Sequence, residues 1–296
     1  MDPFHPLERE AQRLAGVENP PSGAAIRNFM PDQHRQFFEA LMYAFMGAAD
    51  ADGWPVATVL AGPPGFISSP DEHSLRITTY AQGDPVVDSL AVGSEVGLLG
   101  LDLSNRRRNR ANGVVSARDQ RGFSLDIAQS FGNCPQYIQT RVIGVDPAPP
   151  GPIETFEGLD AEAAATVAGA DTFFVASRAS GSQGGVDISH RGGLPGFVQI
   201  KGNVLTIPDY RGNRYFNTLG NLMAEPRAAL LFVDFAAGDL LQLQGRAQID
   251  WQGAGALPSA ERIWRFEVAR GQRRRAAIPL RWAFGEFSPF TLATAA

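Results

Sequence analysis

The chain has 296 residues, of which 44% are hydrophobic and 19% are charged, so it can bury a large core in one or two globular domains. A formal net charge of −5 argues against general nucleic-acid binding. Cys134 is the only cysteine, which excludes an intrachain disulfide and a thiolate metal cluster built by one chain.

No apolar run approaches the roughly 18 residues that a membrane-spanning helix requires. The N-terminal sequence MDPFHPLERE is too polar and acidic for a signal peptide. We therefore expect a cytoplasmic protein that binds neither membranes nor nucleic acids. The four histidines are scattered along the chain, which predicts no metal site.

The first half of the chain predicts an N-terminal extension followed by a β domain. Residues 1–31 are Pro-rich, with a short helix expected near residues 7–14. A helix is expected from Asp32, its predicted N-cap, because apolar residues recur there at helical spacing. The remaining elements of this domain, residues 32–145, are strands near 56–60, 75–79, 96–101, 114–115, 123–127 and 137–145, and a short helix at 86–90.

The second half predicts a similar domain over residues 160–287. A linker is expected over 146–159, because its sequence is rich in proline and glycine. The domain begins with an Ala-rich helix at 160–169, and residues 288–296 form a tail. Its other elements are strands near 172–177, 186–190, 204–207, 229–235, 240–249 and 263–268, and a helix at 217–223 that ends before Pro226.

The two halves look like copies of one unit. Gly62–Phe66 matches Gly193–Phe197, and the strand segments 75–77 and 98–102 match 205–207 and 230–234. Short strands with Gly-rich turns favour a mainly β (α+β) fold of two tandem β-barrels. No G-x-G-x-x-G motif follows a strand, so a Rossmann site has no support. An all-β binding module without a cofactor is the alternative.

The stretch from Ser189 to Asn217 concentrates the residues that suit a phosphorylated ligand. A strand carries His190 and Arg191, a Gly-rich turn follows, and a second strand is expected to end at Ile207. The loop PDYRGNR then adds two arginines before a helix. Arginine side chains and free amides at a helix N-terminus bind phosphate groups.

The corresponding stretch of the first half lacks these arginines. Thr58-Val59-Leu60 matches Ser189-His190-Arg191, and the loop TTYAQGD, Thr78–Asp84, matches PDYRGNR. We therefore expect one cofactor per chain, bound by the second barrel. Arg106–Arg110 could contact the ligand, join an ion network between the two halves, or form a solvated face.

Five motifs together carry a resemblance to a known family: HPLEREAQRLAG from His5, RRRNRANG from Arg106, NCPQYIQ from Asn133, DISHRGGLPGFVQI from Asp187 and IPDYRGNRYFNTLGNL from Ile207. They resemble the FMN-binding split-barrel family related to pyridoxamine 5'-phosphate oxidase, and most closely its tandem-barrel branch. The resemblance spans about residues 5–287.

The resemblance implies FMN bound in a cleft between two split barrels. Among the candidate residues, Gly192 would let the backbone approach the ligand, and His190 has either a structural or a catalytic role. The cofactor-binding residues that it implies are Arg178, Ser189, His190, Arg191, Gly192, Pro208, Asp209, Tyr210, Arg211, Asn213, Arg214 and Asn217.

The function that follows is an FMN-dependent oxidoreductase that passes hydride or electrons from a reductant to a small-molecule substrate. NAD(P)H or a reductase partner would supply the electrons. The resemblance implies a homodimer, but the two barrels of one chain could also form the two-barrel unit alone, with the first barrel as the opposite wall of the cleft. No general acid or base can be named from the sequence. The alternatives are a non-catalytic flavin-binding electron carrier and a split barrel that uses haem or a deazaflavin.

Overall fold

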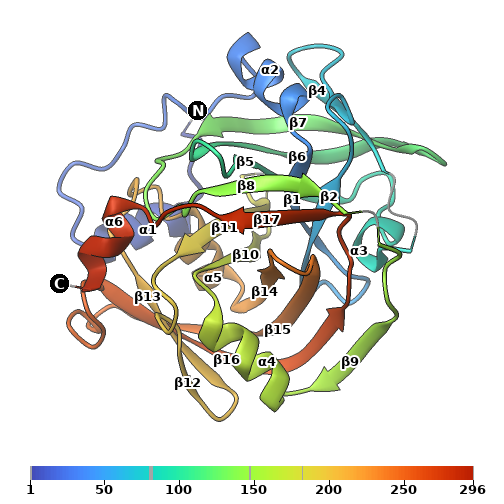
Figure 1. Cartoon of the computed structure of the whole chain (residues 1–296). Helices are drawn as coiled ribbons and strands as arrows, with labels where there is room; N and C mark the ends of the chain where they lie inside the picture. The colour runs from blue at the N-terminus through green and yellow to red at the C-terminus, as the bar shows by residue number, and fades with distance from the viewer. Residues whose placement is uncertain (1, 80–82, 147, 182, 296) are drawn as a thin grey trace.

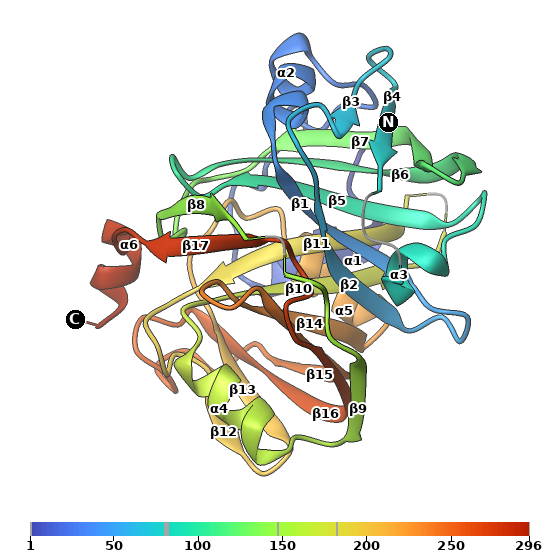
Figure 2. The ribbon, with the colours of Figure 1, turned by 45° about the vertical axis from the view of Figure 1, so that its right-hand side comes forward.

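A computed structural model of the chain describes residues 2–79, 83–146, 148–181 and 183–295 (Figure 1). Its two large antiparallel sheets come one from each half of the chain. Figure 2 shows the sheet of the first half, coloured blue to green, above the sheet of the second half, coloured yellow to red. The prediction of a mainly β fold with short helices is confirmed.

Each sheet has a path of seven strands. The first runs in the order β2 (Pro55–Ala61), β1 (Tyr43–Ala49), β5 (Glu95–Asp102), β6 (Arg107–Asp119), β7 (Gly122–Gly132), β4 (Ser74–Thr78) and β3 (Ile67–Ser68). The second runs in the order β11 (Gly185–Gly192), β10 (Thr172–Ala179), β14 (Arg227–Asp234), β15 (Asp239–Asp250), β16 (Arg262–Arg274), β13 (Val204–Asp209) and β12 (Gln199–Lys201). The two orders are the same, since each strand of the first sheet corresponds to the strand numbered nine higher in the second.

The strand register fixes which residues are equivalent in the two halves. Phe45 of β1 lies opposite Val59 of β2, and Phe174 of β10 lies opposite His190 of β11. The partners of these phenylalanines in the third strand, Leu99 and Leu231, are also equivalent. Thr58-Val59-Leu60 therefore occupies the same place in the first half as Ser189-His190-Arg191 in the second.

Two strand pairings lie outside this common pattern. β9 (Ile153–Glu157) pairs with β16 beyond the end of β13. The predicted linker over 146–159 is therefore wrong in part: residues 153–157 form a strand, because they pair with the free edge of β16. Pro147 lies outside the described residues. β8 (Arg141–Val145) pairs with β17 (Leu280–Phe284), and the strand predicted from residue 137 begins only at Arg141.

The helices are short and lie at the ends and between strands. They are α1 (Pro6–Leu14), α2 (Asp32–Ala40), α3 (Pro85–Asp88), α4 (Ala161–Gly169), α5 (Asn217–Ala224), α6 (Pro289–Leu292) and a 3₁₀ turn, η1 (Ala293–Ala295). Asp160 caps α4 by accepting a hydrogen bond from the Ala163 amide. Asp32 is not an N-cap as predicted: it is the first residue of α2, after Pro31.

Three apolar clusters form the core. One fills each half, and the third joins the two halves through β1, β2 and β5 on one side and β10, β11 and β14 on the other. Backbones approach closely there, since a Cβ on Gly97 would lie 2.8 Å from the Val186 carbonyl oxygen. The β8–β17 pair crosses this junction, where Trp282 packs (Figures 1 and 2).

The N-terminal helix α1 packs against α5 of the second half. A Cβ on Gly220 would lie 2.7 Å from the Glu8 Cα atom, so only glycine allows this approach. The predicted extension contacts both halves, because α1 packs on α5 of the second, whereas Arg27 pairs with Ser130 of β7 in the first. Among the described residues, no helix is long and apolar enough to cross a membrane.

Candidate functional site

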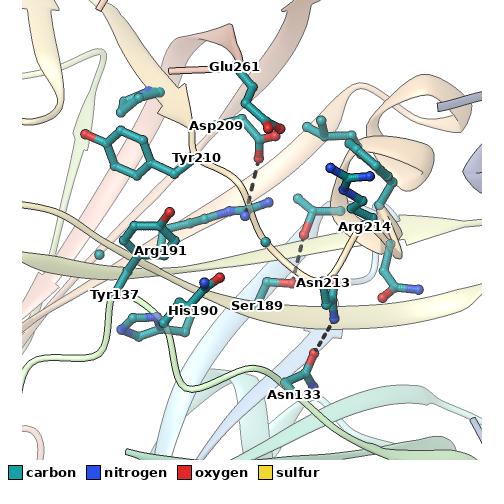
Figure 3. Close-up of a pocket in the computed structure, with 18 of the residues that line it drawn as sticks. Asn133, Tyr137, Ser189, His190, Arg191, Asp209, Tyr210, Asn213, Arg214 and Glu261 are labelled. Atoms are coloured by element: carbon teal, nitrogen blue, oxygen red, sulfur yellow. Dashed lines mark hydrogen bonds and ion pairs between the residues drawn. The ribbon is translucent and has the colours of Figure 1, made fainter. Parts of the chain in front are cut away.

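A cleft that is open to solvent lies where the two halves meet. Strand β11 and the loop before α5 form one wall, and β6 with the segment after β7 forms the other (Figure 3). Both walls come from one chain. Ten of the twelve residues predicted to bind the cofactor line this cleft: Ser189, His190, Arg191, Gly192, Pro208, Asp209, Tyr210, Asn213, Arg214 and Asn217.

The other two predicted residues do not line the cleft. Arg178 lies opposite Val186, toward the far end of the β10–β11 pair from Gly192. Its guanidinium donates a hydrogen bond to the Gly53 carbonyl oxygen at 3.3 Å and lies 3.5 Å from the Glu95 carboxylate. Arg211 is exposed, and its carbonyl oxygen accepts a hydrogen bond from the Tyr137 hydroxyl at 3.1 Å.

The cleft is rich in arginine. Five arginines line it: Arg108, Arg110, Arg191, Arg214 and Arg262. Only two carboxylates, Asp209 and Glu261, lie among them. Asp209 accepts a hydrogen bond from Arg262 and lies 3.4 Å from the Arg191 guanidinium. The lining therefore has excess positive charge, which favours an anionic ligand.

Two of these arginines are incompletely paired. Arg108 makes no side-chain hydrogen bond or ion pair with any residue that the structure describes, and its buried Nε has no partner. Burial, and then the charges of Arg110 and Arg191, lower the pKa of Arg108 to about 9. Burial also lowers the pKa of Arg191, whose Nε has no partner either, although Asp209 opposes the shift. An anion bound between the two guanidinium groups would offset the free-energy cost of burying their positive charges.

Arg110 comes from the first half and is held by the second. It is 6% exposed, and its Nη1 lies 2.5 Å from the Asp187 carboxylate, while its Nη2 donates a hydrogen bond to the Ser189 hydroxyl. Asn112 donates a second hydrogen bond to Asp187 at 2.9 Å. Of the segment Arg106–Arg110, only Arg108 and Arg110 reach the cleft, whereas Arg106 pairs with Glu286.

The first turn of α5 opens onto the cleft. Phe216, at the N-cap position, has a left-handed φ of 63° and makes no side-chain cap, and Arg214 has a φ of 61°. Such backbone conformations cost non-glycine residues energy and often occur at functional sites. The first amides of a helix have no intrahelical acceptors, and Asn217, Thr218 and Leu219 line the cleft. This turn is therefore a ready anion-binding element.

In the first half, the N-terminus of the equivalent helix, α3, is capped by the side chain of its N-cap residue, Asp84. Asp84 accepts hydrogen bonds from the Val86 and Val87 amides at 3.0 and 3.1 Å. Its other carboxylate oxygen accepts a hydrogen bond from the Thr58 hydroxyl at 2.6 Å, and Thr58 is the counterpart of Ser189. The amides at the start of α3 thus already have an anionic partner. Tyr80, Ala81 and Gln82 of the matching loop lie outside the described residues.

An aromatic pair and an amide pair join the two walls. The rings of Tyr137 and Tyr210 stack with centroids 5.2 Å apart. Asn213 donates a hydrogen bond to Asn133 at 3.0 Å (Figure 3). A Cβ on Gly192 would lie 2.0 Å from the Tyr137 carbonyl oxygen. Gly192 therefore lets the two walls meet, which differs from the predicted approach of its backbone to the ligand.

His190 is buried at the back of the cleft. It is 5% exposed, and its Nε2 has no hydrogen-bond partner among the described residues. Burial, and then the charges of Arg108, Arg141 and Arg191, hold the pKa of His190 well below its ordinary value. The imidazole is therefore neutral at physiological pH.

Several lining residues were not predicted as ligands. Asn133, Gln136 and Tyr137 belong to the motif NCPQYIQ, which contributed to the family resemblance but was given no site role. Arg262 lies 53 residues beyond Asp209 in the sequence and has no local sequence signal; only the pairing of β13 with β16 brings it to Asp209. The others are Phe197, Phe216, Thr218, Leu219, Gly212 and Glu261.

Comparison with known proteins gives distant likenesses in fold. No family model matches the chain, and no curated protein does. An FAD-binding protein from Mesorhizobium loti is 14% identical with a TM-score of 0.30, over 42% of this chain and 98% of its own. A candidate pyridoxamine 5'-phosphate oxidase from Lactobacillus delbrueckii is 20% identical with a TM-score of 0.27, over 36% of this chain and 95% of its own.

The haem storage protein HutZ from Vibrio cholerae is also similar, at 16% identity and a TM-score of 0.25, over 43% of this chain and 97% of its own. Proteins of the kind that the motifs resemble are thus among the structural neighbours. At these identities and scores the likeness carries no conclusion about ligand or activity.

Proposed function

We propose that the protein is an FMN-dependent oxidoreductase with one cofactor site per chain, in the cleft between its two halves. The observation that carries this proposal is the uncapped first turn of α5 beside arginines without full partners. A phosphate monoester has nearly two negative charges and accepts several hydrogen bonds. The site offers both kinds of donor.

The residues present fit FMN in the charge and the hydrogen-bond donors that they offer. Arg191 and Arg214, with the amides of the first turn of α5, would hold the phosphate. Arg108 faces them from the first half. Tyr137 and Tyr210 offer aromatic surface near the mouth.

The chain's own contribution is position and electrostatics. FMN, when bound, would supply hydride and electron transfer through its ring system. Burial raises the pKa values of Tyr137 and Tyr210, so both phenols keep their protons and can donate hydrogen bonds. Neutral His190 adds no charge. A small-molecule substrate, and NAD(P)H or a reductase as electron donor, complete the proposal. A homodimer is not needed to build the site, because both walls belong to one chain.

Haem is a second candidate ligand, and it rests on His190. A neutral imidazole with a free nitrogen is the form that binds iron. The Nε2 atom of His190 has no partner in the described structure, and arginines nearby suit carboxylate groups. This candidate predicts loss of ligand when His190 is replaced by alanine, whereas FMN binding depends first on Arg191 and Arg214.

The absorption spectrum of the purified protein, before and after titration with FMN, tests the proposal. Flavin bands and saturable one-to-one binding are expected. A Soret band would favour haem, a shifted flavin-like band would favour a deazaflavin, and a protein that stays colourless and takes up no FMN would overturn the proposal.

A reduction experiment separates the enzyme from an electron carrier. Anaerobic bleaching of bound flavin by NADH or NADPH, followed by reoxidation that depends on an added small-molecule acceptor, is expected of an oxidoreductase. Reduction only through a partner protein, without any small-molecule acceptor, would assign the chain to the carrier class.

A further inference from the structure

The buried face of α1 is polar, which is unusual for a helix that packs on a protein. Its buried residues are Glu8, Ala11 and Gln12, at 4%, 0% and 1% exposure, whereas Leu14 is 38% exposed. A helix held by apolar packing would bury its leucines instead. The sequence of α1 is therefore suited to hydrogen bonding with its neighbour more than to filling the core.

The hydrogen bonds of this face converge on the start of α5. Glu8 accepts one from the Asn217 carboxamide at 2.5 Å and one from the His5 amide at 2.8 Å. Gln12 donates to the Tyr215 carbonyl oxygen at 3.2 Å. Asn217 is the first residue of α5 and lines the cleft. Glu8 thus contacts the first turn of α5 but does not itself line the cleft.

We propose that Glu8 is a positioning residue for the cleft: it fixes the first turn of α5 through Asn217, and an anion bound at that turn favours the protonated form of Glu8. The proposal rests on the proposed function, in which that turn holds a phosphate. A carboxylate and an anion that share one helix end repel each other, so a proton on Glu8 and an anion in the cleft are linked.

The charged groups around Glu8 leave it sensitive to such an anion. On α1 itself, His5 lies 3.9 Å away, and burial lowers its pKa, so it is neutral near pH 7. Asp187 of β11 and Arg110 of β6 act on Glu8 in opposite directions and already pair with each other. Asn221, on α5, is uncharged. Burial raises the pKa of Glu8 to about 7, which places its titration within the stable pH range of most proteins.

Sulfate is the probe of choice, because it mimics a phosphate dianion but does not titrate between pH 6 and 8.5. Calorimetric titration with sulfate, at constant ionic strength in two buffers of different ionisation enthalpy, measures the protons taken up on binding. Wild type is expected to take up a fraction of one proton near pH 7. Its sulfate Kd is expected to rise about fivefold from pH 6 to pH 8, for a coupling near one pKa unit.

Glu8→Gln keeps an acceptor for Asn217 but has no proton to gain. It is expected to bind sulfate with no proton uptake and with a Kd that is flat across this pH range. Glu10→Gln is the matched control, since Glu10 lies on the same helix but pairs with Arg13. It should behave as wild type does.

Two results would overturn the proposal: sulfate binding by wild type without proton uptake, or equal proton uptake by wild type and Glu8→Gln. The first needs no variant, so a folding failure of Glu8→Gln leaves the proposal open to refutation. A protein that binds sulfate with proton uptake but does not bind FMN would refute the proposed cofactor and leave the role of Glu8 intact.

Discussion

Phe45 of the first half stacks on Phe174 of the second, with ring centroids 3.6 Å apart and ring planes inclined by 17°. These two residues hold equivalent places in the two sheets, so corresponding positions of the two halves meet at this contact. Both are buried, at 1% and 0% exposure. The contact joins the halves through β1 and β10, and β10 pairs with β11, which forms part of one wall of the cleft.

Phe174→Ala is expected to lower the free energy of unfolding by about 3–5 kcal/mol, because it removes a buried ring and leaves a cavity between the halves. Urea denaturation measures the change. Phe284→Ala is the control, since Phe284 is 50% exposed, and it should cost well below half as much. Equal costs would show that the junction does not contribute to stability in this way.

Arg191→Ala and Arg214→Ala are each expected to weaken FMN binding by about 10- to 100-fold, the loss of a charge-assisted hydrogen bond worth roughly 1.5–3 kcal/mol. Quenching of flavin fluorescence on binding gives the Kd. Arg178→Ala and Arg211→Ala are matched controls that remove arginines outside the cleft. Similar losses from all four variants would contradict the site and point to a general effect of charge.

Asp84→Ala tests whether the first half binds the cofactor. Its carboxylate caps α3, so the variant is expected to lose about 1 kcal/mol of stability, within a range of roughly 0.5–2 for such caps. Its FMN affinity should stay within twofold of wild type. A large loss of affinity, measured under conditions where the variant is folded, would be inconsistent with a single site at α5.

Arg110→Ala is expected to destabilise the protein by about 3–5 kcal/mol, because it leaves Asp187 buried without its ion-pair partner. Asp187 is 4% exposed. The double variant Arg110→Met with Asp187→Asn should recover part of this loss, since neither buried charge remains. Thermal unfolding of the single and double variants gives the coupling, and strictly additive effects would show that the two residues do not act as a pair.

The pKa of Glu8 gives stability a defined pH dependence. Its folded-state pKa of about 7 lies above its ordinary value of 4.5, so the folded protein holds a proton that the unfolded chain releases. Stability from this group is fully present below about pH 4.5 and is lost as pH rises through 7. The full effect corresponds to about 3 kcal/mol.

Wild type without ligand should therefore unfold at lower urea concentration at pH 8 than at pH 5.5, and Glu8→Gln should reduce that difference. Glu10→Gln, which removes an exposed carboxylate from the same helix, should leave the difference unchanged. A pH dependence of stability that is the same in wild type and Glu8→Gln would assign it to other groups.

Much of the fold was predictable because it depends on local patterns. The apolar alternation of the strands, the turn residues between them and the repeated Gly-Pro segments indicated the strand positions in both halves. The strand β9 was missed, because what makes residues 153–157 a strand is the free edge of β16 and not their own sequence. Likewise Asp32 resembles an N-cap, but the backbone places it one residue inside α2.

The candidate site was predictable on one wall only. The loop from Asp209 to Arg214 was recognisable in the sequence, because arginine and asparagine are concentrated there. The opposite wall depends on how two sheets pack, so the sequence left three possible roles for Arg106–Arg110 and gave no site role to Tyr137. Arg178 shows the reverse error: it lies on β10, which pairs with β11 but does not line the cleft, and near the end of that pair away from Gly192.

Arg110 has a consequence for how the protein is made. It precedes its partner Asp187 by 77 residues, so it leaves the ribosome long before that carboxylate exists. Domains generally fold N-terminal first during synthesis, yet here the nascent first half presents an arginine and an apolar face whose partners come later. The first half can form these contacts only after the second half has been synthesised. A chaperone that shields the apolar face would act before β11 emerges from the ribosome.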